Sequence, residues 1–277
     1  MIRNVIVISD LHCGCQFGLC PDKGITLDGG GRYVPSDNQK KVWQWWKLFW
    51  AEWVPKVTRG EPFALIVNGD TTDGRHHNST TQISQNLSDQ KNIAEEVLFP
   101  IVEQTDTLFM TRGTSSHVGE SGENEEMLAE NLKAVPDSAG NNARNELFCL
   151  VGGETGCLIH VAHHIGTTGS THYESSAVMK EMSESYAEAG RWNNRAPDII
   201  VRSHRHRNIE VRIPTANGYG TGIVTPGWQL KTPFVYRIAG GRLTTPQFGG
   251  ILIRQGDEEH YTRSRVWNIT RPEAEIL

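Results

Sequence analysis

Aspartate and histidine residues follow short apolar runs at five separate places along the chain. These residues are Asp10 and His12, Asp70 and Asp73, His117, His163 and His164, and His204 and His206. The apolar runs before them are typical of short buried strands. In open α/β sheets, ligand sites form outside the carboxyl ends of the strands. We therefore predict that these side chains, although distant in sequence, converge in one crevice.

Strand-like and helical patterns alternate through the first two-thirds of the chain. The predicted strands cover residues 5–8, 63–67, 107–110, 147–151, 157–161 and 198–201. The predicted helices run from 36 or 37 to about 57, from about 89 to 104, over 123–134 and over 175–189. This alternation favours a mostly parallel sheet with both faces buried.

After His206 the pattern changes to short strands separated by Gly and Pro, over residues 209–213, 221–224, 234–238, 250–254 and 261–266. These strands suggest a second, largely antiparallel sheet. We expect a single α/β domain over residues 1–277, of the four-layer α+β type, with two packed mixed β-sheets flanked by helices. Within it we expect an insertion at about 13–60 and a strand-rich part from about 207.

The net charge of −5, with histidine counted as neutral, argues against a broadly basic surface that holds duplex DNA through its phosphates. It leaves room for a local basic groove, and it suits a site that gathers carboxylates around cations. No apolar run is long enough for a signal peptide or a membrane span, so we expect a cytoplasmic protein without membrane contact. In a reducing compartment the five cysteines are expected to be free thiols.

Mixed carboxylate and imidazole residues are typical of sites that hold two divalent metal ions for phosphoester hydrolysis. The ester is anionic, so attack by hydroxide is slow until cations neutralise the phosphate oxygens, and a water that bridges two ions becomes a hydroxide at neutral pH. Mixed ligation suits Mn, Fe or Zn better than Mg. Asp70 is the expected bridging carboxylate, because it stands alone at a Gly-Asp turn.

In their order, these motifs resemble those of the calcineurin-like metallophosphoesterase superfamily. Asp10-Leu11-His12 is similar to the family's Asp-x-His, and Gly69-Asp70-Thr71-Thr72-Asp73 to its Gly-Asp-x-x-Asp. His163-His164 corresponds to a lone or paired His, and His204-Arg205-His206 to Gly-His-x-His, with Ser203 in place of the Gly. The resemblance spans roughly the first three-quarters of the chain and implies a two-sheet sandwich flanked by helices.

The resemblance implies a ligand set for each of two ions. Asp10, His12, Asp70 and His206 would hold one ion, and the bridging Asp70 with His163 and His204 would hold the other. Asp73 would orient a general acid that protonates the leaving oxygen. The implied activity is hydrolysis of phosphomono- or phosphodiesters, as a phosphatase or phosphodiesterase, by a hydroxide that bridges two divalent ions. We expect Mn²⁺, with Fe, Zn or Ni as alternatives.

The third motif departs from the family's pattern. Where the family has an Asn-His pair, this chain reads Arg112-Gly113-Thr114-Ser115-Ser116-His117. A hydroxyl is a weaker metal ligand than an amide oxygen, and three alternatives stay open. Thr114 substitutes for the Asn, His117 moves inward as a ligand, or the second ion is held more loosely. We favour His117 as the general acid and Thr114 as the substitute ligand.

Arg75 and Arg112 are the candidates for substrate binding, since a guanidinium near the metals could clamp a phosphate through two hydrogen bonds. The adjacent His76 and His77 read first as an exposed polar loop. The phosphoester could be a nucleotide or part of a nucleic acid, and the sequence does not predict an oligomeric state. Two other functions stay open, namely a DNA exonuclease or endonuclease of the same superfamily and a non-catalytic scaffold that retains the fold.

Tryptophans recur at helical spacing at positions 43, 46, 50 and 53, which predicts a helix packed on the sheet. An aromatic platform for bases or a partner protein is the alternative. Cys13, Cys15 and Cys20 lack an obvious fourth ligand for a zinc ion, so we interpret them as unpaired thiols of a loop.

Overall fold

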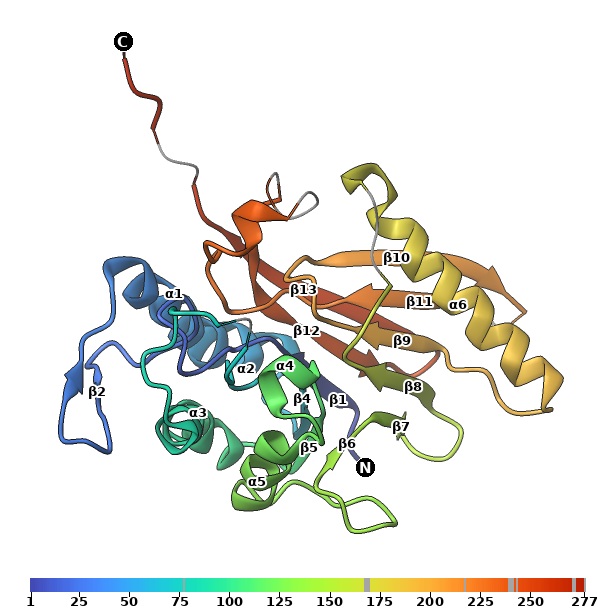
Figure 1. Cartoon of the computed structure of the whole chain (residues 1–277). Coiled ribbons are helices and arrows are strands. Elements are labelled where there is room, and N and C mark those ends of the chain that lie inside the picture. Colours follow the sequence, from blue (N-terminus) through green and yellow to red (C-terminus); the bar gives the residue numbers. More distant parts are fainter. Residues whose placement is uncertain are drawn as a thin grey trace.

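Two β-sheets face each other at the centre of the molecule, and helices cover the outer face of each sheet (Figure 1). The computed structural model describes residues 1–76, 78–166, 170–216, 218–238, 242, 244–270 and 273–276. Apolar side chains from the inner faces of both sheets form one core layer, including Val5, Ile66, Ile159 and Ile253. The prediction of two packed mixed sheets flanked by helices is thereby confirmed.

The first sheet has six strands in the order β13-β12-β1-β4-β5-β6. They are β1 (Asn4–Ile8), β4 (Phe63–Asn68), β5 (Thr107–Thr111), β6 (Ala143–Arg144), β12 (Gln247–Gln255) and β13 (His260–Asn268). β1, β4, β5 and β6 run parallel, whereas β12 is antiparallel to both β1 and β13. Every residue of β1 and β4 is buried, as expected of central strands that are covered on both faces.

The second sheet has five strands in the order β10-β11-β9-β8-β7. They are β7 (Glu146–Val151), β8 (Cys157–Ala162), β9 (Ile199–Arg202), β10 (Ile209–Thr215) and β11 (Gly218–Val224). The three central strands run parallel and the two edge strands are antiparallel to their neighbours. A small separate ribbon pairs β2 (Ile25–Thr26) with β3 (Arg32–Tyr33).

The strands after His206 do not form a sheet of their own, which corrects the expectation from the sequence. β10 and β11 extend the second sheet, whereas β12 and β13 extend the first sheet beside β1. This pairing covers the open edge of β1, whose backbone groups would otherwise lack partners. The strand predicted over 234–238 is also wrong, because Val235–Arg237 forms a 3-10 turn. The amide of Val235 donates to the carbonyl of Thr232, a turn contact in place of a ladder contact.

Helices pack on the outer face of each sheet. On the first sheet these are α1 (Asp37–Leu48), which continues through a π-helical turn (Phe49–Trp53) into α2 (Val54–Thr58), then α3 (Leu87–Val102) and α5 (Glu123–Asn131). On the second sheet, α6 (Glu174–Arg191) follows a 3-10 turn (Thr171–Tyr173) and packs against β10 and β11. The short α4 (Ser115–Val118) follows β5. No helix of the described residues is long and apolar enough to cross a bilayer.

The tryptophans at positions 43, 46, 50 and 53 pack toward the first sheet, as their helical spacing predicted. Trp46 and Phe49 are buried and contact the fully buried Trp228 edge-on, at ring distances of 4.9 and 5.7 Å. The backbone N–H of Trp228 donates to the carbonyl of Asp10. The aromatic cluster thus supports the end of β1, where the first motif begins.

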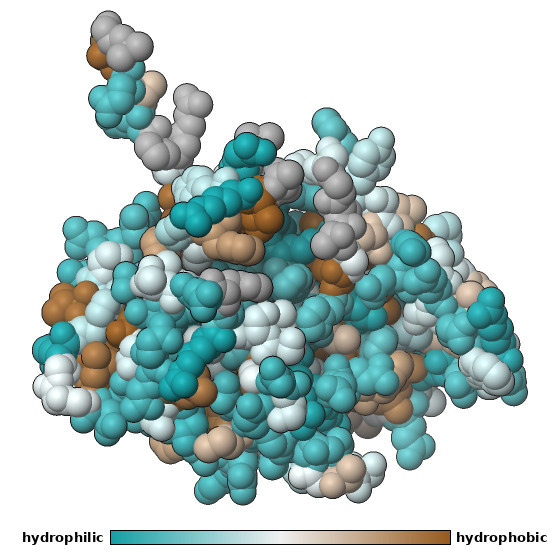
Figure 2. Space-filling model, viewed as in Figure 1, coloured by the Kyte–Doolittle hydropathy of each residue, from teal (hydrophilic) through white to brown (hydrophobic). Residues whose placement is uncertain are grey.

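The surface is mostly hydrophilic on the face seen in Figure 2, with hydrophobic residues in small scattered groups. All five cysteines are free, which agrees with the expected thiols. Cys13, Cys15 and Cys20 are buried, so their loop packs against the core instead of projecting into solvent.

Candidate metal centre

The side chains of the five motifs meet at the carboxyl ends of β1, β4, β5, β8 and β9. Among the described residues there are four groups of one carboxylate and two imidazoles whose possible ligand atoms lie within 4.8 Å of one another, and three of these groups share no residue. Group one is Asp10, His12 and His206; group two is Asp70, His163 and His204; group three is Asp73, His76 and His117. The crevice predicted from the sequence is therefore present.

The atoms of group one lie close together, and one of them has no hydrogen-bond partner among the residues that the structure describes. The Nε2 atoms of His12 and His206 lie 3.3 Å apart, and Nε2 of His206 lies 3.3 Å from Oδ1 of Asp10. This Oδ1 is buried and accepts no hydrogen bond within the described chain. Because His12 donates its Nδ1–H to Asp73, its Nε2 keeps a lone pair. Electron pairs that face one another in this way fit a divalent cation between them.

In group two, too, imidazole nitrogens lie close to a buried carboxylate. His163 donates its Nδ1–H to the carbonyl of Asn68 (2.7 Å), so its Nε2 faces Oδ2 of Asp70 at 3.0 Å. Nδ1 of His204 lies 3.9 Å from the same carboxylate oxygen. The Thr114 hydroxyl lies 3.1 Å from both Oδ2 of Asp70 and Nδ1 of His204. The Thr114 hydroxyl therefore lies beside the carboxylate and one imidazole of group two, and its role as a ligand stays a prediction.

Charge within the two groups favours cation binding. Although burial alone would raise them, the neighbouring histidines hold the pKa values of the Asp10 and Asp70 carboxyls well below their usual range. Burial alone would lower the pKa of His163, but the carboxylates of Asp70 and Asp10 raise it to about 10. In the metal-free protein a proton on His163 therefore lies between two carboxylates, where a metal ion would satisfy the same charges.

Asp70 belongs to group two and also lies close to the residues of group one. Together with His12 and His117 it forms a further set of possible ligands, and Nε2 of His163 lies 3.8 Å from Oδ1 of Asp10 in group one. Gly113 makes this position possible, because a Cβ atom there would overlap the Asp70 carboxylate. The placement suits a carboxylate shared by two ions.

The backbone at the candidate ligands is strained. The angle φ is positive at five of them, Asp10 (54°), His12 (45°), Asp70 (52°), His204 (71°) and His206 (51°). Left-handed conformations are uncommon outside glycine and gather at functional sites, where the surrounding structure enforces them. These turns direct side chains from successive strand ends into the same space.

A buried chain of hydrogen bonds joins the strand ends beneath the groups. Asn68 donates to the Ser203 hydroxyl (2.6 Å) and accepts from the Thr111 hydroxyl (2.6 Å). The Thr225 hydroxyl lies 2.7 Å from those of Ser203 and Ser9. Ser9, Asn68, Thr111 and Ser203 each lie directly before a motif. The hydroxyl of Ser203 completes this chain, which accounts for a serine where the family pattern has Gly.

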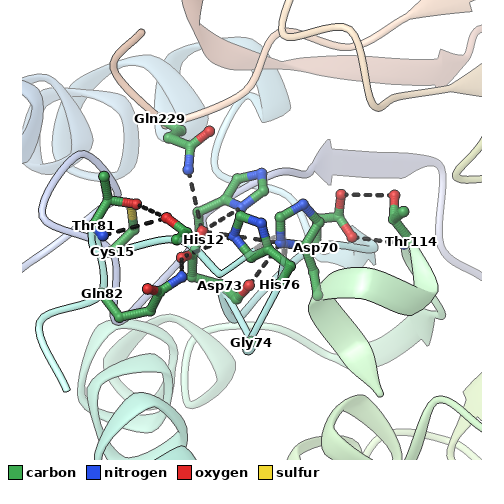
Figure 3. Close-up of polar contacts among 12 residues, drawn as sticks. His12, Cys15, Asp70, Asp73, Gly74, His76, Thr81, Gln82, Thr114 and Gln229 are labelled. Atoms are coloured by element: carbon green, nitrogen blue, oxygen red, sulfur yellow. Dashed lines mark hydrogen bonds and ion pairs between the residues drawn. The ribbon is translucent and has the colours of Figure 1, made fainter. Parts of the chain in front are cut away.

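The carboxylate of Asp73 is a centre of polar contacts (Figure 3). Its Oδ1 accepts from Nδ1 of His12 (3.3 Å), and its Oδ2 accepts from Gln82 (2.9 Å) and lies 3.3 Å from Nε2 of His76. Asp73 also contacts His117, the expected general acid. Nδ1 of His117 donates to the backbone carbonyl of Asp73 (2.6 Å) and lies 3.9 Å from its Oδ1. The carboxylate itself fixes His12.

His117 projects into the site from α4. Its ring lies 4.6 Å from that of His12 and 4.4 Å from that of His76. Burial and the charge of His12 lower the pKa of His117 to about 4 in the metal-free protein. With its Nδ1–H donated to a carbonyl, Nε2 is the atom that remains for proton exchange or for a metal ion. Both roles expected for His117 are compatible with this position.

A cavity of about 700 Å³ opens above the groups, but the two arginines expected to clamp phosphate do not line it. Arg75 is exposed and donates to the carbonyl of Gln85, while Arg112 pairs with Glu126 at 3.3 Å. Each guanidinium binds a protein partner outside the cavity, so the part of Arg75 and Arg112 in substrate binding stays a prediction. His77 lies outside the described residues.

Glu125 of α5 (Glu123–Asn131) is a further residue of the site, and none of the motifs in the sequence includes it. It is fully buried and accepts from the amide of Thr71 (3.0 Å), the hydroxyl of Thr71 (2.9 Å) and the amide of Gly113 (2.6 Å). Thr71 follows Asp70, and Gly113 precedes Thr114, so one carboxylate holds both loops of group two.

A signal for Glu125 was present in its helical register. The residue lies three and four positions before Leu128 and Ala129, so it shares the buried face of α5 with them. Burial and the charge of Asp70 raise the pKa of Glu125 to about 7. A carboxylate on the apolar face of a short helix is the feature that would have marked it.

No protein-family model matches the sequence, and no curated protein matches it. Solved structures that resemble this one include vacuolar protein sorting 29 from Cryptosporidium parvum (12% identity, covering 97% of this chain and 99% of that one, TM-score 0.36). A predicted phosphoesterase from Streptococcus pneumoniae gives 10% identity, coverage of 96% and 99%, and a TM-score of 0.34. A metallophosphoesterase from Sphaerobacter thermophilus gives 10% identity, coverage of 97% and 89%, and a TM-score of 0.39.

At these TM-scores, the function has to be inferred from the residues of the site itself. The two-sheet sandwich and the ordered motifs at its strand ends are those that the resemblance to the calcineurin-like metallophosphoesterase superfamily implies.

Proposed function

We propose that this chain is a metal-dependent phosphoesterase that hydrolyses phosphomono- or phosphodiesters with two divalent ions. The observation that carries the proposal is the adjacency of groups one and two, with the Asp70 carboxylate beside both. Two ions at these positions would neutralise the phosphate oxygens and supply the nucleophilic water. The mixture of carboxylate and imidazole ligands favours Mn²⁺, with Fe, Zn or Ni as alternatives.

The residues of the chain have distinct parts in this proposal. Asp10, His12 and His206 would hold one ion, while His163, His204 and the Thr114 hydroxyl would hold the other, with Asp70 shared. Asp73 keeps Nε2 of His12 free of a proton by accepting from its Nδ1–H. Glu125 keeps the loops of Asp70 and Thr114 together.

His117 would donate the proton to the leaving oxygen. Its pKa of about 4 in the metal-free protein means that it is neutral there at pH 7. An anionic phosphate beside the ring would favour the imidazolium form and raise this pKa. The proton would therefore be held at Nε2 once substrate is bound, while the Asp73 carbonyl keeps the ring oriented through Nδ1.

Turnover of simple chromogenic esters tests the proposal. The protein is stripped with a chelator, reloaded with Mn²⁺ and assayed with p-nitrophenyl phosphate and bis-p-nitrophenyl phosphate. We expect hydrolysis that requires Mn²⁺ and is abolished in Asp10→Asn. Asp257→Asn is the matched control, because Asp257 is an exposed carboxylate paired with Arg3. Bound metal without turnover of either ester would contradict the proposal and favour a scaffold function.

A further inference from the structure

The part of the cavity lining outside the Asp-His groups, here called the wall, is positively charged, although the chain as a whole carries a net charge of −5. Arg205, Arg207, Lys231 and Arg237 line the cavity. Among the described lining residues, Glu174 is the one acid outside the three Asp-His groups. This leaves an excess of three positive charges on the wall. An anion would be attracted to such an excess.

Lys231 and Arg237 have no acidic partner among the described residues, and Arg205, which donates to the backbone carbonyl of Glu174 (3.2 Å), is in direct contact with no carboxylate. Arg207 pairs with Glu174 at 3.1 Å. Within the described parts of the chain, no carboxylate lies within 4.0 Å of the side-chain nitrogens of Arg205, Lys231 or Arg237. Cations without a counter-ion beside a hollow are the usual means of binding phosphate or carboxylate groups.

Lys231 is held in position without being neutralised. Its Nζ donates to the carbonyls of Arg242 (2.5 Å) and Thr244 (3.1 Å), and it lies 4.2 Å from the centre of the Tyr236 ring. Carbonyl oxygens and an aromatic ring carry no full negative charge, so the positive charge of Lys231 remains for an anionic ligand. Arg237 is exposed at the rim, where its guanidinium can reach a bound molecule.

The backbone places this charge close to the metal centre. Arg205 lies between His204 and His206 in the sequence. Lys231 follows two residues after Gln229, whose amide donates to Oδ1 of Asp73 (3.4 Å; Figure 3). Two residues span at most about 7 Å of chain. An anionic group a short distance from the scissile phosphate would therefore meet these cations.

The same wall has an apolar part. Leu230, Pro233, Val235 and Ile238 line it, and Ile165 lines the cavity as well. Inorganic phosphate would gain nothing from such surface, but a purine or pyrimidine ring can be buried against it. The wall thus combines groups that recognise phosphate with groups that recognise a base.

On the basis of the proposed function, we propose that the substrate is a nucleotide with at least two phosphate groups. The scissile phosphate would lie at groups one and two, and a second phosphate would bind Arg205, Lys231 and Arg237. Water adds to the phosphorus, the P–O bond to the leaving oxygen breaks, and that oxygen takes a proton. Hydrolysis then releases one phosphate and a nucleotide that retains the other.

The test compares adenosine 3′,5′-bisphosphate with adenosine 5′-monophosphate, which differ by one phosphate. For the Mn²⁺-loaded wild type we expect kcat/KM to be about 10-fold higher for the bisphosphate, as one added charge-assisted contact would give. Arg237→Ala should remove most of this preference, mainly through KM. Lys231→Met, which keeps the aliphatic stem, should do the same. Arg263→Ala is the control, because Arg263 is an exposed cation of β13 outside the cavity.

Two results would overturn the inference. One is an equal kcat/KM for both nucleotides in the wild type, and the other is a loss in Arg237→Ala and Lys231→Met that is the same for both. Preference for an oligothymidylate over the bisphosphate, mediated by the same cations, would also contradict a nucleotide-sized substrate.

Failure of the proposed function would be recognised separately. If the wild type hydrolyses neither nucleotide, calorimetric dissociation constants in the same buffers still report on the wall. Tighter binding of the bisphosphate that Arg237→Ala removes would support the phosphate-binding wall on a protein that is not a phosphoesterase. Equal dissociation constants for the bisphosphate and the monophosphate would also exclude a phosphate-binding role for the cations of the wall.

Discussion

Groups one and two are built from the same residue types but are held differently. Group one matches the family pattern at each position, and Asp73 fixes its His12 from behind. Group two contains His204, whose side chain is 39% exposed, and the Thr114 hydroxyl lies 3.1 Å from Nδ1 of this histidine. Its loops are joined by Glu125 instead of by the motif itself. From this difference we expect an ion at group two to bind more weakly than an ion at group one.

The largest effect is expected from a substitution of Asp70, the residue that we expect both ions to share. Asp70→Asn keeps the shape of the side chain but removes its charge, so we expect loss of both ions. A fall in kcat/KM of about 1000-fold or more should follow, since the ions contribute several kcal/mol of charge stabilisation. Metal analysis after gel filtration and steady-state kinetics provide the measurements. Retention of one tightly bound ion would show that Asp70 does not bridge.

His117 distinguishes catalysis from ligation. In His117→Ala we expect both ions to stay and kcat to fall about 100-fold for phenyl phosphate, whose leaving oxygen needs a proton. The loss should be smaller for p-nitrophenyl phosphate, whose leaving group is more acidic. The slope of log kcat against leaving-group pKa, compared with that of the wild type, measures this. Loss of one ion in the variant would instead assign His117 as a ligand.

Glu125 sharpens the difference between the groups. Glu125→Gln places an amide where two backbone N–H groups need an acceptor, so the loops of group two should shift. We expect affinity for the weaker ion to fall about 10- to 100-fold, as for other residues that orient metal ligands. Affinity for the tighter ion should hold, and high Mn²⁺ should restore activity.

The control for Glu125 is Glu130→Gln, an exposed acid on the same helix. Equal weakening of both ions, or activity that excess Mn²⁺ fails to restore, would contradict a role specific to group two. Thermal unfolding of both variants would show whether the helix itself has been disturbed.

The smallest expected effect is the release of a proton from His163 when a metal ion binds, and it reports on group two alone. The raised pKa of His163, about 10 against an ordinary 6.5, means that its proton stabilises the metal-free fold below pH 6.5. This contribution is lost as the pH rises through about 10. Metal binding needs the neutral ring, so we expect the ion of group two to release about one proton at pH 8. Calorimetry in two buffers of different ionisation enthalpy measures it, and binding without release would argue against His163 as a ligand.

The sequence predicted those features that depend on local patterns. The apolar runs before Asp10, Asp70 and His163 marked buried strands, and the strand ends brought the motifs together. It did not predict that β12 and β13 would join the first sheet, because pairing partners depend on which strand edge is open. The apolar stretch at 234–238 looked like a strand, although it lines the cavity as a turn.

Side-chain direction was the other feature that the sequence left undetermined. Arg75 and Arg112 are adjacent to site residues in the chain but bind partners outside the cavity, whereas Lys231 and Arg237 come from a distant segment and line it. The helical register of α5 indicates that Glu125 is buried, but the contact of its carboxylate with Thr71 depends on the packing of α5 against β5.

The most direct test of the central claim is a Mn²⁺ titration of metal-free protein followed by electron paramagnetic resonance. Two ions that share the Asp70 carboxylate should bind in sequence, one tightly and one more weakly, and the second equivalent should produce an exchange-coupled spectrum. A single site, or two sites whose spectra stay those of isolated Mn²⁺, would contradict a dinuclear centre built from groups one and two.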